Sequence, residues 1–136
     1  MKFLSTCEAD TIQCARQFAK TLRGNEIIAL EGTLGMGKTV FARGVIQALS
    51  GNPTEVPSPT FTLLQTYDTP LGIVYHFDFY RLKNQMEAYE IGIEDAFYDG
   101  ICLIEWPEKI GTLLPQNTIH IQFKTTPEGR QISWGE

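Results

Sequence analysis

The sequence lacks any long hydrophobic run. None of its apolar stretches approaches the roughly 20 residues that a membrane-spanning helix needs. The short apolar start, residues 1–4, is followed at once by polar residues, so no signal peptide is expected. These absences favour a cytoplasmic protein that does not act at a membrane.

Positive charge and cysteine are also scarce. The formal net charge is −5, which argues against binding nucleic acid by electrostatic attraction alone. RNA handled through a partner is still compatible with this charge. The three cysteines, Cys7, Cys14 and Cys102, are odd in number and lack metal-ligand spacing. This pattern favours reduced thiols.

One motif stands out against this background. Residues 32–39 read GTLGMGKT and match the phosphate-binding loop G-x-x-x-x-G-K-[ST]. Its glycines let successive backbone N–H groups turn inward around a phosphate chain. Lys38 can reach the β- and γ-phosphates, and the Thr39 hydroxyl can bind Mg²⁺. The motif therefore predicts binding of ATP or ADP with Mg²⁺.

The flanking segments agree with a phosphate-binding loop. Residues 26–30 are a short apolar run, typical of a buried strand. Residues 39–49 place apolar side chains at helical spacing, and Ser50 with Gly51 ends that helix. The positive end of the helix would favour an anion. A glycine turn without ligand is the alternative, and the order strand, loop, helix argues against it.

The rest of the chain completes one α/β domain, residues 1–136. We expect a P-loop NTPase-like three-layer domain whose mixed sheet has a parallel core plus antiparallel hairpins. The further elements that periodicity and turn residues predict are a helix over 11–22 with Asp10 as N-cap, strands over 60–67 and 72–80, a helix over 84–98 broken near Gly92, a strand over 101–104, and a hairpin of strands 118–125 and 130–134.

Two acids follow apolar strands. Asp78 comes after residues 73–77, and Glu105 comes after residues 101–104. Phosphate-loop enzymes place an acid at a strand's carboxyl end, where it holds Mg²⁺ directly or through water. A solvated carboxylate without function is the alternative for each acid alone.

Residues 56–61 read VPSPTF and lie between the helix after the phosphate loop and the next strand. Two of them, Ser58 and Thr60, carry hydroxyl groups. Nucleotide switches use such segments, and Thr60 is the candidate for contact with the γ-phosphate and Mg²⁺. The alternative is a rigid loop in which Ser58 caps a turn.

Three more residues near these acids have both a functional and a purely structural interpretation. His76 should share a strand face with Asp78 and is either a packed, hydrogen-bonded histidine or a catalyst. Arg81 would meet a phosphate, a carboxylate or only a surface ion pair. Trp106 would stack on a partner, cover the site or simply pack.

With these segments in place, the chain resembles the TsaE (YjeE) family, small bacterial ATPases needed to make threonylcarbamoyladenosine on tRNA. The matching segments occur in the family's order and at its approximate spacing: LEGTLGMGKT at 30–39, SPTFTL at 58–63, HFDFYRL at 76–82 and LIEWPE at 103–108. The loop is generic, but the other three segments together are specific.

The resemblance implies a role for each segment. Thr39 and Glu105 would hold Mg²⁺, and Asp78 would be the second acid of the site. Residues 58–60 would form the switch segment, with Trp106 close by. The residues expected to act in hydrolysis are Lys38, Thr60, Asp78 and Glu105. Those expected to bind the nucleotide, including one from the helix that would cover the adenine, are Thr11, Leu34, Gly35, Met36, Gly37, Lys38, Thr39 and Val40.

The resemblance also implies a partner, the TsaB–TsaD heterodimer, whose TsaD subunit modifies the adenosine beside the anticodon. Hydrolysis of ATP, weak in isolation, would reset that complex, and tRNA would be met only through it. Two departures matter. Thr33 stands where the family usually has Asp, and the segment after Glu108 suggests no functional residue.

Other nucleotide-binding functions have less support. A small-molecule kinase usually needs several arginines around the transferred phosphate, and no arginine-rich lid segment is present. A GTPase would show an [NT]-K-x-D motif, which is missing. A nucleotide-dependent binding module without useful catalysis stays open.

Overall fold

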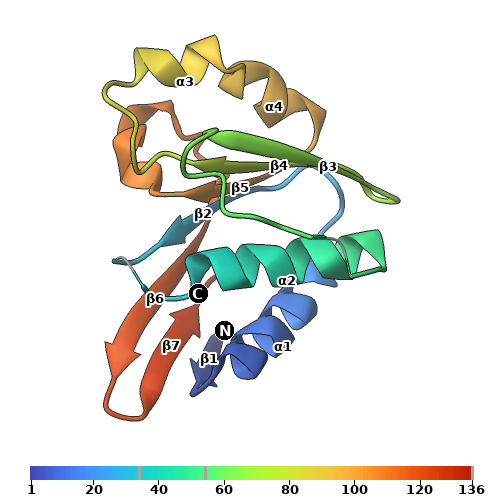
Figure 1. The fold of residues 1–136 in the computed structure, drawn as a ribbon, viewed down its shortest axis with the longest axis vertical. Coiled ribbons are helices and arrows are strands. Elements are labelled where there is room, and N and C mark those ends of the chain that lie inside the picture. The colour runs from blue at the N-terminus through green and yellow to red at the C-terminus, as the bar shows by residue number, and fades with distance from the viewer. Residues whose placement is uncertain (34, 54, 136) are drawn as a thin grey trace.

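The computed structural model describes residues 1–33, 35–53 and 55–135. Leu34, expected in the phosphate loop, lies outside the described residues. Helices and strands alternate along most of the chain (Figure 1) in the order β1 (Lys2–Ser5), α1 (Glu8–Ala19), β2 (Ile27–Glu31), α2 (Lys38–Ser50), β3 (Leu64–Thr69), β4 (Gly72–Asp78), α3 (Met86–Glu90), α4 (Ile93–Asp99), β5 (Ile101–Glu105), the short 3₁₀ helices η1 (Pro107–Lys109) and η2 (Gly111–Leu113), β6 (Ile119–Thr126) and β7 (Gly129–Ser133).

The strands form one mixed sheet in the order β1-β7-β6-β2-β5-β4-β3. The four inner strands β6, β2, β5 and β4 are parallel to one another. Antiparallel pairs complete the sheet at both edges, where β3 joins β4 and the β6–β7 hairpin is joined by β1. The prediction of a parallel core with antiparallel hairpins is confirmed.

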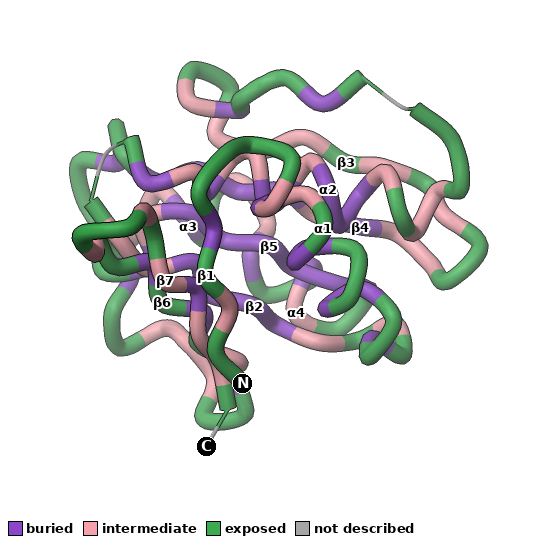
Figure 2. The backbone as a smooth tube through the Cα atoms, turned by 90° about the horizontal axis from the view of Figure 1, so that it is seen from below, coloured by how far each residue is buried: buried purple, intermediate pink, exposed green. Residues whose placement is uncertain are grey.

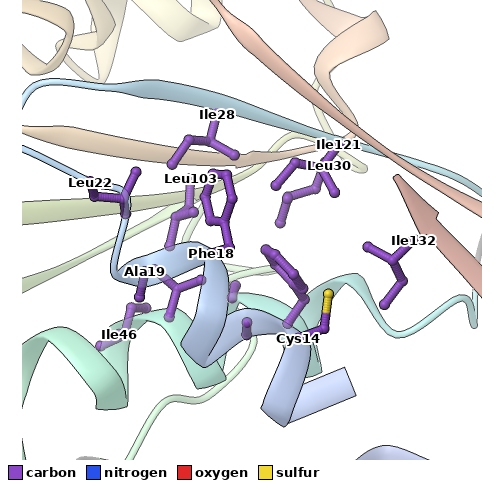
Figure 3. Packing of buried hydrophobic residues seen from close by; sticks show 14 of the residues in the cluster. Cys14, Phe18, Ala19, Leu22, Ile28, Leu30, Ile46, Leu103, Ile121 and Ile132 are labelled. Atoms are coloured by element: carbon purple, nitrogen blue, oxygen red, sulfur yellow. The ribbon is translucent and has the colours of Figure 1, made fainter. Parts of the chain in front are cut away.

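Helices cover both faces of this sheet, which makes three layers. Helices α1 and α2 lie together on one face, and α3 and α4 lie on the other (Figure 1). Side chains of α1 such as Phe18 and Cys14 pack between α2 and sheet residues such as Ile28 (Figure 3). A second cluster, with Phe77 and Ile93, fills the opposite face.

The burial of β2 and β5 explains why their continuous apolar runs predicted strands correctly. Every residue of β5 is buried, as are the first four of β2, because neighbours and helices enclose both strands. Figure 2 shows these central strands as buried tube and the outer connections as largely exposed. Among the described residues, no helix combines the length and apolar character that crossing a bilayer would require.

Parallel pairing brings strand ends together. Asp78 at the end of β4 pairs in register with Glu105 at the end of β5. Leu30 of β2 pairs with Glu105 on its other side. Because the loop before α2 directly follows β2, both acids lie beside it.

Several local predictions were wrong or incomplete. The predicted strand over 72–80 ends at Asp78, and the predicted helix over 11–22 ends at Ala19. The helix over 11–22 begins at Glu8 with Cys7 as N-cap, and Asp10 lies in its first turn. There the Asp10 carboxylate accepts hydrogen bonds from the backbone N–H and hydroxyl of Thr6. These bonds hold the pKa of Asp10 below its usual value. The strand over 60–67 begins only at Leu64, after a turn whose Leu63 has a positive φ of 68°. Strand β1 was not predicted.

Candidate nucleotide-binding site

The loop between β2 and α2 has the backbone that its glycines permit. Gly35 and Gly37 take φ values of 81° and 89°, in the left-handed region that other residues avoid. Gly37 is the N-cap of α2, so the helix begins at Lys38. The first N–H groups of α2 therefore face the end of the loop, as an anion site requires.

Lys38 is buried at the base of this loop. Its Nζ donates a 2.6 Å hydrogen bond to the Gly32 carbonyl oxygen and lies 3.5 Å from the centre of the Trp106 ring. Burial lowers the pKa of Lys38 below its ordinary value, while Glu105 and other nearby acids oppose that shift. A bound phosphate would oppose it further.

Partly buried Thr39 and the buried strand residues Glu105 and His76 contact one another in series. The Thr39 hydroxyl donates to the Glu105 carboxylate, at 2.8 Å to Oε1. The other oxygen, Oε2, lies 2.7 Å from Nε2 of fully buried His76. Because a carboxylate only accepts hydrogen bonds, Nε2–H of His76 donates to Glu105, and Nδ1 has no partner among the described residues. Of the two readings of His76, the structure shows the packed, hydrogen-bonded one.

A second series of hydrogen bonds joins residues 58–60 to Asp78. The Thr60 hydroxyl donates to Asp78 Oδ2 at 2.8 Å. Because that uses its only proton, Ser58 must donate to Thr60 across their 2.8 Å contact. The other oxygen of Asp78 accepts the Tyr80 backbone N–H at 2.9 Å. Asp78 thus ties residues 58–60 to the end of β4.

These residues line one cavity of about 440 Å³. It brings together the four residues expected to act in hydrolysis, which come from separate parts of the sequence. The lining residues are Gly35, Met36, Gly37, Lys38, Thr39, Val40, Ser58, Thr60, Asp78, Tyr80, Glu105, Trp106 and Arg130.

Thr11 lines a different, adjoining cavity of about 570 Å³. Buried Thr11 exchanges a 2.7 Å hydrogen bond with the Ser5 hydroxyl, which ties α1 to β1. The residues that the two cavities share are Gly35, Met36, Gly37, Val40 and Arg130. A ligand reaching from one cavity into the other would pass over the glycine loop.

The remaining candidates have clear positions. Trp106 takes a positive φ of 58°, uncommon for a residue with a side chain, and its ring packs 4.9 Å from Tyr80. Trp106 therefore covers one side of the site. Arg81 meets neither phosphate-loop residue nor carboxylate among the described contacts, because its guanidinium lies 4.3 Å from the centre of the Phe61 ring.

Of the residues that line both cavities, the sequence analysis did not predict Arg130. Arg130 comes from the C-terminal hairpin, which suggested no functional residue. Only a weak signal was available, a lone arginine after the turn glycine of the hairpin.

The site's oxygen atoms suit Mg²⁺. The Thr39 hydroxyl and the Glu105 carboxylate, already in contact, are hard oxygen ligands of the kind that this ion prefers. Within residues 1–33, 35–53 and 55–135, no group of three or more histidine, cysteine, aspartate or glutamate side chains is placed to hold a metal. Mg²⁺ here would therefore take its other ligands from phosphate and water, as it usually does.

Comparisons with known proteins agree on one family. The family model described as threonylcarbamoyl adenosine biosynthesis protein TsaE matches residues 5–132. The tRNA threonylcarbamoyladenosine biosynthesis protein TsaE of Rickettsia bellii is 45% identical over 125 residues, which cover 92% of this chain and 87% of the relative. The Treponema pallidum protein of the same name is 34% identical over 132 residues, 96% of each chain.

A solved structure gives the same result for the fold. The crystal structure of Bacillus subtilis YdiB superposes with a TM-score of 0.81 and 29% sequence identity. The match covers 98% of this chain and 83% of YdiB. The overall fold is therefore found in an experimental structure of a similar sequence.

Proposed function

The chain belongs to the TsaE family of threonylcarbamoyladenosine biosynthesis proteins, and we propose that it is the Mg²⁺-dependent ATPase subunit of tRNA modification. In this proposal it binds and hydrolyses ATP as a nucleotide switch. The switch resets the TsaB–TsaD complex, which modifies the adenosine next to the anticodon.

One observation carries the proposal. A single cavity at the amino end of α2 holds Lys38 and Thr39 together with both strand-end acids and Thr60. A glycine turn serving only the fold would not need buried charged and hydroxyl groups around it, since burying them costs free energy. Their convergence supports a phosphate site that performs chemistry.

Each residue has a part that follows from its position. Thr39 and Glu105 would hold Mg²⁺, which when bound offsets the charge that develops during phosphoryl transfer. Lys38 supplies a positive charge at the base of the loop, where β- and γ-phosphates would lie. His76 holds the Glu105 carboxylate in place from below.

Asp78 and Thr60 supply the switch. With Thr60 bonded to Asp78, Ser58 and Thr60 already line the cavity. A γ-phosphate would offer the Thr60 hydroxyl an acceptor in place of Asp78, so the segment's order would depend on whether ATP or ADP is bound. The TsaB–TsaD complex could then sense the nucleotide state through Ser58, the exposed residue of this segment.

The second cavity suits the rest of the nucleotide. It adjoins the glycine loop and is closed by Thr11 and the β1–α1 connection. Adenine would lie there with α1 beside it. The net charge of −5 gives no reason for direct tRNA binding, so contact with tRNA would pass through the partner complex.

The test is ATP turnover with and without the TsaB–TsaD complex. We expect slow release of phosphate from the isolated chain and a clear rise when the complex is added. Lys38→Ala in the same mixture should give background turnover. A phosphorylated small molecule in place of free phosphate would indicate a kinase, and nucleotide binding without any turnover would indicate a binding module.

A further inference from the structure

The C-terminal hairpin places the positively charged side chain of Arg130 at both cavities of the candidate nucleotide site. Arg130 lies on β7, whose backbone pairs with β1 on one side and β6 on the other, opposite Ser5 and Thr125. Gly129, directly before it, approaches the Ser5 carbonyl oxygen so closely that a side chain would collide with it. Three strands therefore fix the backbone position of Arg130.

The direction of the Arg130 side chain follows from strand alternation. Arg130 and Ile132 share one face of β7. Ile132 is fully buried beneath α1 (Figure 3), so this is the face that α1 and α2 cover. Arg130 extends over the start of α2, where its Nη1 lies 3.6 Å from the place that a Cβ on Gly37 would take.

Arg130 is the positive residue that both cavities share. The other charged residues lining them are Lys38, Asp78 and Glu105 in the first and Glu8 in the second. Lys38 is already bonded to Gly32, and Glu8 lies 3.7 Å from Arg43. Within the part of the chain that the structure describes, the Arg130 guanidinium has no hydrogen bond or ion pair.

We propose that Arg130 binds the α- and β-phosphates of the nucleotide at the junction of the two cavities, an inference that rests on the proposed ATP-binding function. A planar guanidinium offers paired N–H donors that match phosphate oxygens. Its position beside Gly37, on the side toward the Thr11 cavity, is where the phosphate chain would leave the loop. Because ATP and ADP share these two phosphates, Arg130 serves the binding of both.

The experiment is calorimetric titration of ADP and of a non-hydrolysable ATP analogue, with Mg²⁺, into the wild-type chain and four variants. Arg130→Gln should raise Kd for both nucleotides by about tenfold or more, the usual effect of losing a charge-assisted hydrogen bond. Arg130→Lys should recover part of the loss. Lys124→Gln removes a charge from the same hairpin at a residue that lines neither cavity, and should leave Kd almost unchanged. Lys38→Ala serves as the loop control.

The outcomes separate this inference from the proposed function. If the wild-type chain binds neither nucleotide, the proposed function and the inference about Arg130 are both wrong. If Lys38→Ala weakens binding and Arg130→Gln does not, only the assignment of Arg130 falls. A loss confined to the ATP analogue, or one equal to that of Lys124→Gln, also overturns it. Thermal unfolding of each variant without nucleotide shows that the hairpin still folds.

Discussion

The Thr39 hydroxyl donates a 2.8 Å hydrogen bond to the carboxylate of Glu105, although the two residues lie 66 positions apart. Thr39 lies in the first turn of α2 and Glu105 ends β5, and the parallel pairing of β2 with β5 brings them together. The same two oxygen groups are those a Mg²⁺ ion would need here. In the proposed function these two groups are the protein ligands of Mg²⁺, and their contact would bring them together before the ion binds.

Glu105→Gln should separate the metal role of this carboxylate from its structural role. Glutamine keeps an oxygen that can accept the Nε2–H of His76, whereas alanine would leave a buried histidine without any partner. We expect Mg²⁺-dependent ADP affinity to fall roughly tenfold or more and turnover to fall further. Titrations with and without Mg²⁺ measure this, and equal Mg²⁺ dependence in variant and wild type would contradict the assignment.

Asp78→Asn should behave differently. The Asp78 carboxylate holds Thr60 and the Tyr80 backbone rather than Thr39. Turnover with the partner complex should fall, while ADP affinity should change by less than about threefold, because ADP lacks the phosphate that the Thr60 segment would meet. An ADP affinity reduced as far as in Glu105→Gln would place Asp78 among the metal ligands instead.

Lys38→Ala should abolish hydrolysis. Lys38 is the lysine of the phosphate loop, and its Nζ is held at the base of the cavity by Gly32 and Trp106. Its removal should cost on the order of several kcal/mol of transition-state stabilisation. Release of phosphate measures this, with the thermal midpoint as a check on folding. Near-normal turnover would overturn the assignment of the loop.

The two strand-end acids were predictable because their signal is local. An apolar run followed by an acid predicts a buried strand with a carboxylate at its end, and parallel pairing then aligns Asp78 with Glu105. The phosphate loop was predictable for the same reason, since its motif, strand and helix are contiguous. The fold class followed from the order of these segments.

The missing parts depend on distant pairing. Strand β1 has four residues with no clear alternation of buried and exposed positions, and it forms by pairing with β7 at the other end of the chain. The position of Arg130 beside both cavities depends on that pairing and on which face of β7 is covered by α1. Residues 60–63 were expected to be part of a strand because their composition suits one. They form a turn instead, and Leu63, at the end of that turn, has a positive φ, which is not a strand conformation.

Gly44→Ala should destabilise the contact between the two helices of one layer. A Cβ at Gly44 of α2 would lie 2.7 Å from the Ala15 Cβ of α1, closer than real carbon contacts allow. Separating the helices should cost about 1–3 kcal/mol, against a helix-propensity gain of about 1 kcal/mol. A lower midpoint in urea unfolding is expected.

The control for that substitution is Ala48→Gly, at an exposed position of the same helix. It measures the propensity difference alone, about 1 kcal/mol. If Gly44→Ala proved more stable than the wild-type chain by a similar amount, propensity would be the whole effect. The close packing of α1 on α2 would then be wrong.

The last prediction concerns Thr60 and the proline segment around it. The Thr60 hydroxyl bonds to Asp78 and accepts from Ser58, so a γ-phosphate and its Mg²⁺ could add contacts to a segment already in place. Pro57 and Pro59 limit the entropy lost when it becomes fully ordered. Hydrogen exchange over residues 55–62 should therefore be slower with a non-hydrolysable ATP analogue than with ADP, with the partner complex bound. Thr60→Val should abolish that difference. Thr62→Val should keep it, because the Thr62 hydroxyl accepts a solvent-exposed hydrogen bond from the Gln65 side chain and makes no hydrogen bond to Asp78 among the described residues. Equal exchange in the two nucleotide states of the wild-type chain would make the segment a rigid loop and Thr60 a structural residue.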